Sequence, residues 1–384
     1  MKIILFDPHP VRENLLPLTY TRPVADMRLG ITTIAEKWQA LLPGSYSWQT
    51  EDYLAELFPP CDDPADAVFV AGNVVPDPAL ATAVAALGPD AALWCGDTLV
   101  ARRGDASVRC EYPGPAPIVI LHIYDIFLLN GAALRADFAR LTAGRTSQPL
   151  SDTVMVIGPR DRVFLEEGAW VEGCILNTTA GPVYIGRDAT VMEGSMLRGP
   201  VAVCDHATVN MGTKIYPDTT VGPWCKVGGE LNNVVIHSYS NKAHDGFLGN
   251  AVIGSWCNLG AGCVASNLKN SYDLIRLWNY PAHRFLRTDL QFCGLIMGDH
   301  SKAGINTMFN TATVVGVGCN IHGSGMPRPF VPSFSDGGPV AGFSEVDMNH
   351  FFLTAERVMA RRHVTFTEAH RRVLLAIRSA AEGL

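Results

Sequence analysis

The sequence lacks a long hydrophobic run. No stretch of ~18 apolar residues occurs, so we expect no membrane-spanning helix. Residues 1–7 (MKIILFD) hold only a short apolar run, which predicts a buried first strand rather than a signal peptide and a cytoplasmic protein. Only 17% of residues are charged and the net charge is -7, which argues against a nucleic-acid binder and favours small-molecule partners.

Closely spaced metal-binding motifs are also absent. The ten cysteines show no CxxC spacing, so we expect reduced thiols that act as small apolar fillers. His237, His244, His300 and His322 are never at His-x4-His spacing, which disfavours a zinc site that hydrates carbon dioxide. Glycine is missing from residues 344–382, where apolar residues recur at helical spacing. We therefore expect a helical tail, residues 344–384, with two helices that pack on the preceding domain or on a neighbouring subunit.

A six-residue period fills the second half of the chain. Eight aliphatic residues follow it: Ile185, Val191, Leu197, Val203, Val209, Ile215, Val221 and Val227. Helices repeat every 3.6 residues and strands every two, so a hexad period predicts a parallel β-helix, with about 18 residues in each triangular coil. After a slip the period returns at Phe247, Ile253, Leu259, Met297, Ala303, Phe309, Val315 and Ile321. We predict a left-handed parallel β-helix domain over residues 154–343, with the hexad prism ending near residue 323 and a loop leaving it between residues 264 and 295.

The first part of the chain has a different pattern. Short apolar runs alternate with a helical stretch; the runs are residues 3–6, 67–70 and 118–121, and the helix is residues 78–87. This alternation is typical of a parallel sheet covered by helices. We therefore predict an α/β domain over residues 1–142, followed by a polar linker, residues 143–153.

Several phrases resemble a known family. Residues 12–23 (RENLLPLTYTRP) are similar to the signature of sugar-1-phosphate nucleotidyltransferases. Residues 240–250 (SNKAHDGFLGN) and 253–262 (IGSWCNLGAG) resemble the acetyltransferase half of the bifunctional GlmU family. Together with residues 293–311 (CGLIMGDHSKAGINTMFNT), they look most like the alternative GlmU-like sugar nucleotidyltransferases of the Bacteroidetes, over nearly the whole chain.

The resemblance implies a homotrimeric transferase of sugar-nucleotide biosynthesis, in the route to UDP-N-acetylglucosamine. The first domain, nucleotidyltransferase-like, would join a sugar-1-phosphate to a nucleotide from UTP or dTTP with the help of Mg²⁺. The β-helix would transfer acetyl from acetyl-CoA to an amino-sugar phosphate, with His244 as general base and Asn258 as a substrate contact, because imidazole titrates near neutral pH. By the same resemblance, Ala303, Gly304 and Ile321 would line the acetyl-CoA groove.

The phosphate contacts must differ from those of the family, because two of its cationic positions hold neutral or acidic residues here. A phosphate needs donors or cations, so Lys226, Lys242, Lys269 or Arg276 would replace them. Lys226 lies 18 residues before His244, about one coil away.

The predicted nucleotide site lacks the family's glycine-rich loop. The corresponding residues 7–12 read DPHPVR, and proline has no N–H to offer a phosphate. We expect Arg12 and Arg22 to hold phosphates, with Asn73 and Asp97 nearby and Asp125 as the metal ligand. The alternative is a non-catalytic sugar-nucleotide-binding domain that a structural β-helix trimerises.

Overall fold

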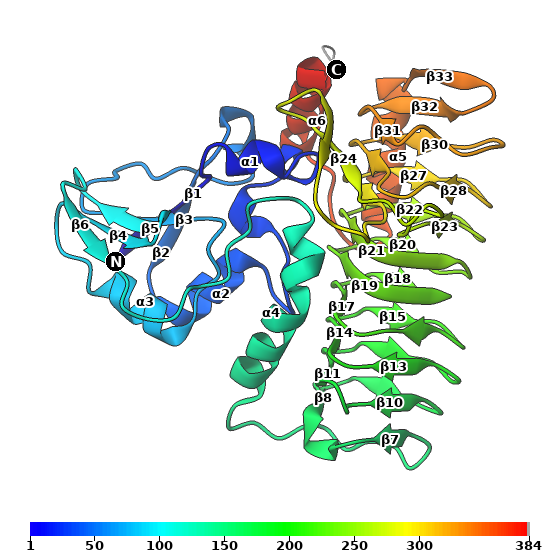
Figure 1. The fold of residues 1–384 in the computed structure, drawn as a ribbon, viewed down its shortest axis with the longest axis horizontal. Helices are drawn as coiled ribbons and strands as arrows, with labels where there is room; N and C mark the ends of the chain where they lie inside the picture. The colour runs from blue at the N-terminus through cyan, green and yellow to red at the C-terminus, as the bar shows by residue number, and fades with distance from the viewer. Residues whose placement is uncertain (382–384) are drawn as a thin grey trace. The chain divides into compact units, whose positions relative to one another are not determined.

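The computed structural model describes residues 1–381, which form two compact units (Figure 1). The first comprises Met1–Arg28, Thr32–Ile123 and Glu368–Ile377. The second comprises Leu29–Ile31, Tyr124–Thr367 and residues 378–381. The helix that starts at Asp125 therefore belongs to the second unit.

The first unit contains one six-stranded sheet of order β2-β1-β3-β5-β4-β6. Its strands are β1 (Lys2–Phe6), β2 (Ser45–Gln49), β3 (Val68–Ala71), β4 (Ala91–Cys95), β5 (Thr98–Arg103) and β6 (Val108–Glu111). Strand β1 is parallel to β2 and β3, whereas β5 is antiparallel to both β3 and β4. Strand β4 is parallel to β6, so the sheet is mixed, and the prediction of a parallel sheet fails at β5, which is antiparallel to both of its neighbours.

The predicted strand at residues 118–121 is wrong. A single bridge joins Val119 to Val74, and the backbone of Ile118 and Ile120 pairs with Val75 and Asn73 in a loop. The prolines immediately before this run lack the N–H groups that a sheet ladder needs, which explains why the apolar run remains irregular.

Three short helices belong to the same unit: α1 (Val11–Asn14), α2 (Ile34–Leu41) and α3 (Pro78–Ala85). Helix α2 begins with a capping box, in which the Thr33 hydroxyl accepts from the Glu36 N–H and the Glu36 carboxylate accepts from the Thr33 N–H. Helix α3, predicted from the sequence, has Asp77 as its N-cap and a proline at its first position.

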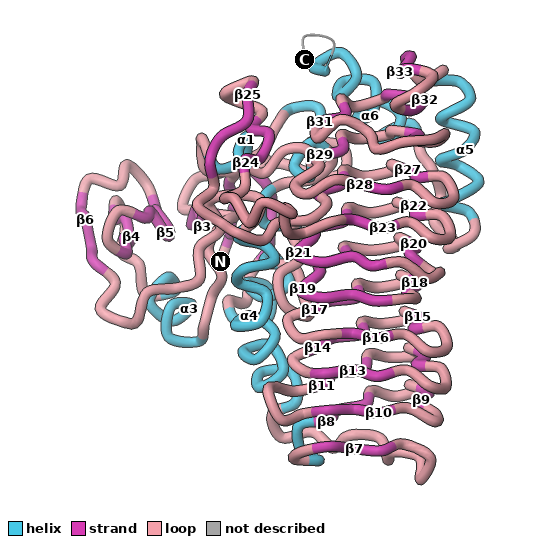
Figure 2. Tube along the Cα trace, turned by 45° about the vertical axis from the view of Figure 1, so that its right-hand side comes forward, coloured by secondary structure: helices cyan, strands magenta, loops and turns pink. Residues whose placement is uncertain are grey.

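The second unit is a parallel β-solenoid, as predicted (Figure 2). Its larger sheet contains β7 (Met155–Ile157), β8 (Val163–Leu165), β10 (Ile175–Asn177), β11 (Val183–Ile185), β13 (Met196–Arg198), β14 (Val201–Val203), β16 (Lys214–Ile215), β17 (Thr219–Val221), β19 (Glu230–Ile236), β21 (Phe247–Ile253), β23 (Val264–Ala265), β26 (Ile296–Met297), β28 (Met308–Phe309), β29 (Val314–Val315) and β31 (Phe330–Val331). Its second sheet contains β9 (Trp170–Val171), β12 (Thr190–Val191), β15 (Thr208–Val209), β18 (Lys226–Val227), β20 (Asn241–Lys242), β22 (Asn258–Leu259), β27 (Lys302–Ala303), β30 (Asn320–Ile321), β32 (Ser335–Gly338) and β33 (Gly342–Glu345).

The hexad residues fill the interior of this solenoid. All eight residues of the first run and seven of the eight in the second are buried in one apolar core, which confirms the period. The exception is Phe247, which is only half-buried; Leu248 takes the inward position instead, opposite Leu231 of the preceding coil. The coils after Val227 are shorter than 18 residues, so the inward-facing position moves by one residue along the strand. The prediction for Phe247 was wrong for this reason.

The stack also continues past the expected end near residue 323. Strands β31 and β32 lie parallel to β29 and β30, and Val331 joins the core. The glycines and prolines of residues 322–329 break the period without ending the solenoid. The predicted interruption between residues 264 and 295 is confirmed: it carries the antiparallel hairpin of β24 (Arg276–Asn279) and β25 (Arg284–Arg287), which form a separate two-stranded sheet.

Helices cover parts of the solenoid. Helix α4 (Asp125–Thr142) packs Leu134 into a small apolar cluster with Phe164, Tyr184 and Ala202 of three successive coils. The tail contains the two predicted helices, α5 (Met348–Ala360) and α6 (Glu368–Ala381).

The described residues also bear on two expectations from composition. All ten cysteines are free thiols, and seven of them are buried, as expected of apolar fillers. Across residues 1–381, no helix combines the length and the apolar character that a membrane span requires.

The interior of the solenoid predicts a sharp contrast between neighbouring residues. Leu197→Ala should lower the free energy of unfolding by about 2–5 kcal/mol, because Leu197 is 1% exposed and its truncation leaves a cavity. Met196 precedes it on β13 and is 42% exposed, so Met196→Ala should change stability by less than about 1 kcal/mol. Urea denaturation of both variants measures the difference; equal losses would contradict the assigned register.

Candidate active site

Stacking of the coils creates a polar ladder on the outside of the second sheet. The register aligns Lys226 with Asn241, Asn241 with Asn258, and Asn258 with Lys302. The Asn241 amide Nδ2 donates to Asn258 Oδ1 at 3.4 Å. Two of the predicted substrate residues, Lys226 and Asn258, therefore lie on one face.

The turn that carries His244 is held by hydrogen bonds to three of its backbone carbonyl oxygens. The carbonyl oxygen of Ala243 accepts from Asn210 Nδ2 at 2.7 Å, that of His244 accepts from Lys242 Nζ at 2.7 Å, and that of Asp245 accepts from the Gly262 N–H at 3.1 Å. A side chain at Gly228 would meet the Ala243 oxygen at 2.4 Å, so only glycine allows this close approach. The fixed turn leaves the His244 side chain exposed.

Lys242 points to the interior rather than to a ligand. It is 2% exposed, and its position follows Val227 in the inward column of the second sheet. Its Nζ donates to the carbonyl oxygens of Gly228 and His244, at 3.2 and 2.7 Å. Burial lowers the pKa of Lys242 to about 8, and the nearby Cys263 and Asp245 only partly oppose this shift. The structure thus places Lys242 as a support of the His244 turn.

A cavity of about 390 Å³ joins His244 to the ladder. Its wall includes His244, Asn258 and Lys226, three of the residues expected from the sequence, together with Arg361 and Arg362 of the tail. Arg362 Nη2 donates to Asn241 Oδ1 at 3.1 Å, whereas its buried Nε has no hydrogen-bond partner among the described residues. The pKa of Arg362 is lowered by burial and then by the neighbouring charge of Arg361, so an anion in this cavity would be stabilised.

A second lobe of about 310 Å³ shares four lining residues with the first: Asn241, Asn258, Arg361 and Arg362. It adds Lys302, whose pKa is lowered by burial and whose Nζ donates to the His300 carbonyl oxygen at 2.9 Å. Its aromatic wall is Tyr239 stacked on Trp256, with ring centroids 4.0 Å apart. No aspartate or glutamate is among the residues that line either lobe.

The remaining predicted residues of the solenoid lie elsewhere. Arg276 lines a different cavity, on the hairpin β24–β25, together with Lys269. The side chains of Ala303 and Ile321 are 3% and 1% exposed and belong to the interior core, so they offer no side chain to an outer groove. Gly304 contributes backbone only, with its N–H donating to the Ile321 carbonyl oxygen at 2.7 Å.

In the first unit, the loop expected to bind phosphate is stabilised by its own side chains. Arg12 is buried; its Nη1 donates to Asp7 Oδ2 at 3.2 Å and its Nη2 to the Tyr53 hydroxyl at 2.9 Å. Asp7 also accepts from the Val24 N–H at 2.7 Å and from Thr50 Oγ1 at 2.5 Å, and burial raises the pKa of this carboxyl. Arg12 is therefore part of an internal network.

Asn73 and Arg22 are buried as well. Asn73 Nδ2 donates to the Ile120 carbonyl oxygen at 3.0 Å, but its buried Oδ1 has no hydrogen-bond partner in the part of the chain that the structure describes. Such an orphaned acceptor is costly unless a ligand or water donates to it. Arg22 forms an ion pair with Asp26 at 3.5 Å.

The two candidate acids belong to different units. Asp97 is exposed on the tight turn between β4 and β5, and Asp125 lies in the first turn of α4, in the other unit. Within residues 1–381, no group of three or more His, Cys, Asp or Glu side chains could hold a metal ion. The side chains present therefore do not fit a preformed Mg²⁺ site.

Sequence reasoning missed Arg361 and Arg362. They follow helix α5, where cations are favoured by the helix dipole, and Arg362 lies 121 residues from Asn241, to which it donates. The richness of the tail in arginine was visible, but only the packing of α5 on the solenoid, through Phe351 against Phe334 at 5.7 Å, brings the pair to His244.

Comparison with known proteins adds the class of the first region. A family model described as sugar nucleotidyl transferase matches residues 3–146. The chain is similar to the bifunctional protein GlmU of Synechococcus sp. (29% identity over 162 residues, covering 42% of this chain and 21% of that protein) and of Rhodococcus opacus (27% over 239 residues, covering 55% and 43%). The match thus spans less than half of each curated relative. These findings support the predicted transferase class and, in its coarser form, the resemblance to GlmU.

Two solved structures share weaker likenesses. The UDP-N-acetylglucosamine acyltransferase of Francisella novicida has a TM-score of 0.29 at 11% identity, covering 56% of this chain and 72% of that one. That of Arabidopsis has a TM-score of 0.20 at 16% identity, covering 56% and 82%. With scores this low, neither likeness supports an argument.

The buried amine of Lys242 predicts a specific pH dependence. Its pKa falls from 10.5 to about 8 on folding, so between these values the unfolded chain binds a proton that the folded one does not, and stability rises with pH. The stability of the wild type relative to Lys242→Met should increase by on the order of 3 kcal/mol from pH 8 to 10.5. Denaturant titrations across this range measure it. Lys214→Met, at an exposed lysine of β16, serves as control and should show no such trend.

Proposed function

We propose that the solenoid transfers an acetyl group from acetyl-CoA to the amine of an amino-sugar phosphate, with His244 as general base. The observation that carries this proposal is the exposed imidazole in a cavity whose charged lining residues, Lys226, Arg361 and Arg362, are all cations. We also propose that the chain is a member of the Bacteroidetes group of GlmU-like proteins.

The reaction follows from the position of His244. The imidazole takes a proton from the substrate amine as the nitrogen attacks the thioester carbonyl carbon, which forms a tetrahedral intermediate. The C–S bond then breaks, the amide remains on the sugar, and the imidazolium returns the proton to the leaving thiolate. The Lys242 bond to the His244 carbonyl oxygen fixes the turn from which the imidazole acts.

The phosphate of the acceptor would give the cations of this cavity an anionic partner, because no acidic residue lines it. Arg361, Arg362 and Lys226 line the same cavity as His244, and Arg362 Nε is a buried donor without a partner among the described residues. A phosphate there would accept charge-assisted hydrogen bonds. Asn258, which is hydrogen-bonded to Asn241, offers a neutral contact to a sugar hydroxyl.

The base role of His244 predicts a large loss of turnover. His244→Ala should lower the rate of thiol release from acetyl-CoA in the presence of an amino-sugar phosphate by about 10²–10⁴-fold, the usual contribution of a general base. Ellman titration of free thiol measures the rate. His350→Ala is the matched control, because His350 is exposed on α5 and lines neither lobe. Undiminished turnover in His244→Ala would remove the assigned role.

A second candidate activity concerns the first unit, because residues 3–146 match the sugar nucleotidyl transferases. We propose that this unit binds a nucleotide and a sugar-1-phosphate and joins them with release of pyrophosphate. Mg²⁺, where it takes part, would have to arrive with the nucleotide, since the side chains do not preform its site. The alternative remains a unit that binds a sugar nucleotide without turning it over, in a homotrimer built on the solenoid.

A substitution of Asn73, whose buried Oδ1 has no partner among the described residues, tests whether the first unit binds a nucleotide or has only a structural role. Wild type should release pyrophosphate from UTP or dTTP with a sugar-1-phosphate, and Asn73→Ala should weaken nucleotide binding about tenfold by removing a buried acceptor to which a bound nucleotide would donate. A coupled phosphate assay and calorimetric titration measure the two effects. Asp105→Asn, on the exposed turn between β5 and β6, serves as control. Nucleotide binding without pyrophosphate release would identify a binding domain. The absence of both binding and release would contradict the proposal.

A further inference from the structure

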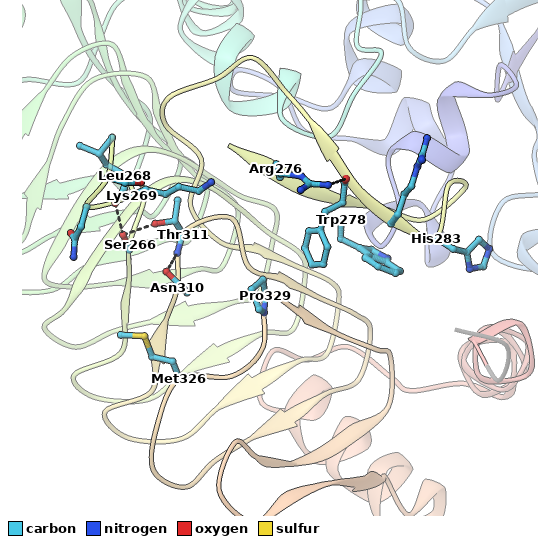
Figure 3. A pocket seen from close by; sticks show the side chains of 14 residues that line it. Ser266, Leu268, Lys269, Arg276, Trp278, His283, Asn310, Thr311, Met326 and Pro329 are labelled. Carbon is cyan, nitrogen blue, oxygen red and sulfur yellow. Dashed lines mark hydrogen bonds between the residues drawn. The ribbon is translucent and has the colours of Figure 1, made fainter. Parts of the chain in front are cut away.

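A cavity of about 1020 Å³ lies between the inserted hairpin β24–β25 and the adjoining coils (Figure 3). Arg276, Trp278 and His283 come from the hairpin segment, whereas Thr311 and Met326 come from the coil side. The cavity shares no lining residue with the two lobes near His244. It is therefore a separate site, within the size range of ligand pockets.

The hairpin wall is fixed in place by aromatic contacts. Trp278 stacks on Phe330 of strand β31, with ring centroids 4.1 Å apart and an interplanar angle of 12°. Tyr280 meets the same ring edge-on at 5.6 Å. The base of the insertion is pinned by the Cys293 N–H, which donates to the Asn267 carbonyl oxygen at 2.9 Å. The site is thus preorganised, which lowers the entropic cost of binding.

The cavity is lined by cations, and no acidic side chain of the lining balances their charge. Lys269, Arg276, His283 and Arg284 line the cavity, and none of the lining residues is acidic. Lys269 Nζ and Arg276 Nη2 donate to carbonyl oxygens, at 2.9 and 3.1 Å, and neither they nor Arg284 pair with a carboxylate in the described part of the chain. The strand register also sets Arg276 directly opposite Arg287, which itself pairs with Asp289 at 4.0 Å, so the lining cations keep no share of that carboxylate.

The same cavity is also lined by aromatic and aliphatic side chains. Trp278 and Phe285 line it with Leu268, Met326 and Pro329. The buried Nε1 of Trp278 has no acceptor within the described residues. The cavity thus combines cations with aromatic rings, a lining that suits a ligand carrying both a phosphate and a flat heterocycle.

We propose that this cavity binds a nucleoside phosphate, with the phosphate on Lys269, Arg276 and Arg284 and the base against Trp278 and Phe285. The proposal does not depend on acyl transfer at His244, because the two sites share no residue. The nucleoside phosphate has two possible sources, a sugar nucleotide or the 3′-phosphoadenosine end of a coenzyme A thioester.

Calorimetric titration of the full chain tests this assignment. The ligands are UDP, dTDP, adenosine 3′,5′-bisphosphate, uridine and inorganic phosphate. At least one nucleotide should bind about tenfold or more tightly than both uridine and inorganic phosphate, because each of these lacks one half of the recognised chemistry. Binding of a pyrimidine diphosphate identifies a sugar nucleotide as the source, and binding of the adenosine bisphosphate identifies coenzyme A; either result supports the site.

Paired variants locate the binding. The double variant Arg276→Gln/Arg284→Gln should weaken nucleotide binding about tenfold or more, and it should fold normally because both side chains are exposed. Arg160→Gln/Arg162→Gln removes the same charge from two exposed positions that line none of these cavities, and it should leave the affinity unchanged. The proposal is overturned if the first pair has no effect, if inorganic phosphate binds as tightly as every nucleotide, or if no nucleotide binds.

Discussion

The in-register stacking of parallel coils is the constraint on which the second unit depends. Because every strand residue lies directly above its counterpart in the preceding coil, inward and outward positions form continuous columns. The inward column of the second sheet runs through Val209, Val227, Leu259 and Ala303, which bury against one another and hold the stack together. The outward column is free to be polar, and the ladder from Lys226 to Lys302 uses that freedom. The same register that builds the core therefore assembles the candidate site.

Lys242 is the exception that connects the core to the chemistry. A lysine in an inward position is costly, since burial disfavours its charge, and the lowered pKa records that cost. Its two hydrogen bonds to the carbonyl oxygens of Gly228 and His244 offset part of it. An aliphatic residue would pack as well but would leave both oxygens without this donor. The buried lysine thus lowers stability but fixes the turn of His244, and a general base must be held in a fixed position to act.

The sequence was sufficient for the solenoid because its period is long and uniform, and a hexad fits no other regular structure. It was also sufficient to group Lys226, His244 and Asn258, which one cavity brings together. It failed where parity changed: after the shorter coils, residue type alone could not show that Leu248 rather than Phe247 points inward, or that Lys242 is internal. Arg361 and Arg362 were beyond reach for a different reason, since only tertiary packing of α5 brings them to the ladder.

The interruption of the solenoid explains how one stack offers two separate cationic cavities. Strand β22 pairs directly with β27 across the inserted residues, so the ladder continues without a break while the chain between them leaves the core. The inserted hairpin then docks on a later coil through Trp278 and Phe330, and encloses a space that a continuous solenoid could not form. Because β22 and β27 remain in register, the hairpin can change without disturbing His244. A scaffold built in this way can gain a second ligand site while the first keeps its geometry.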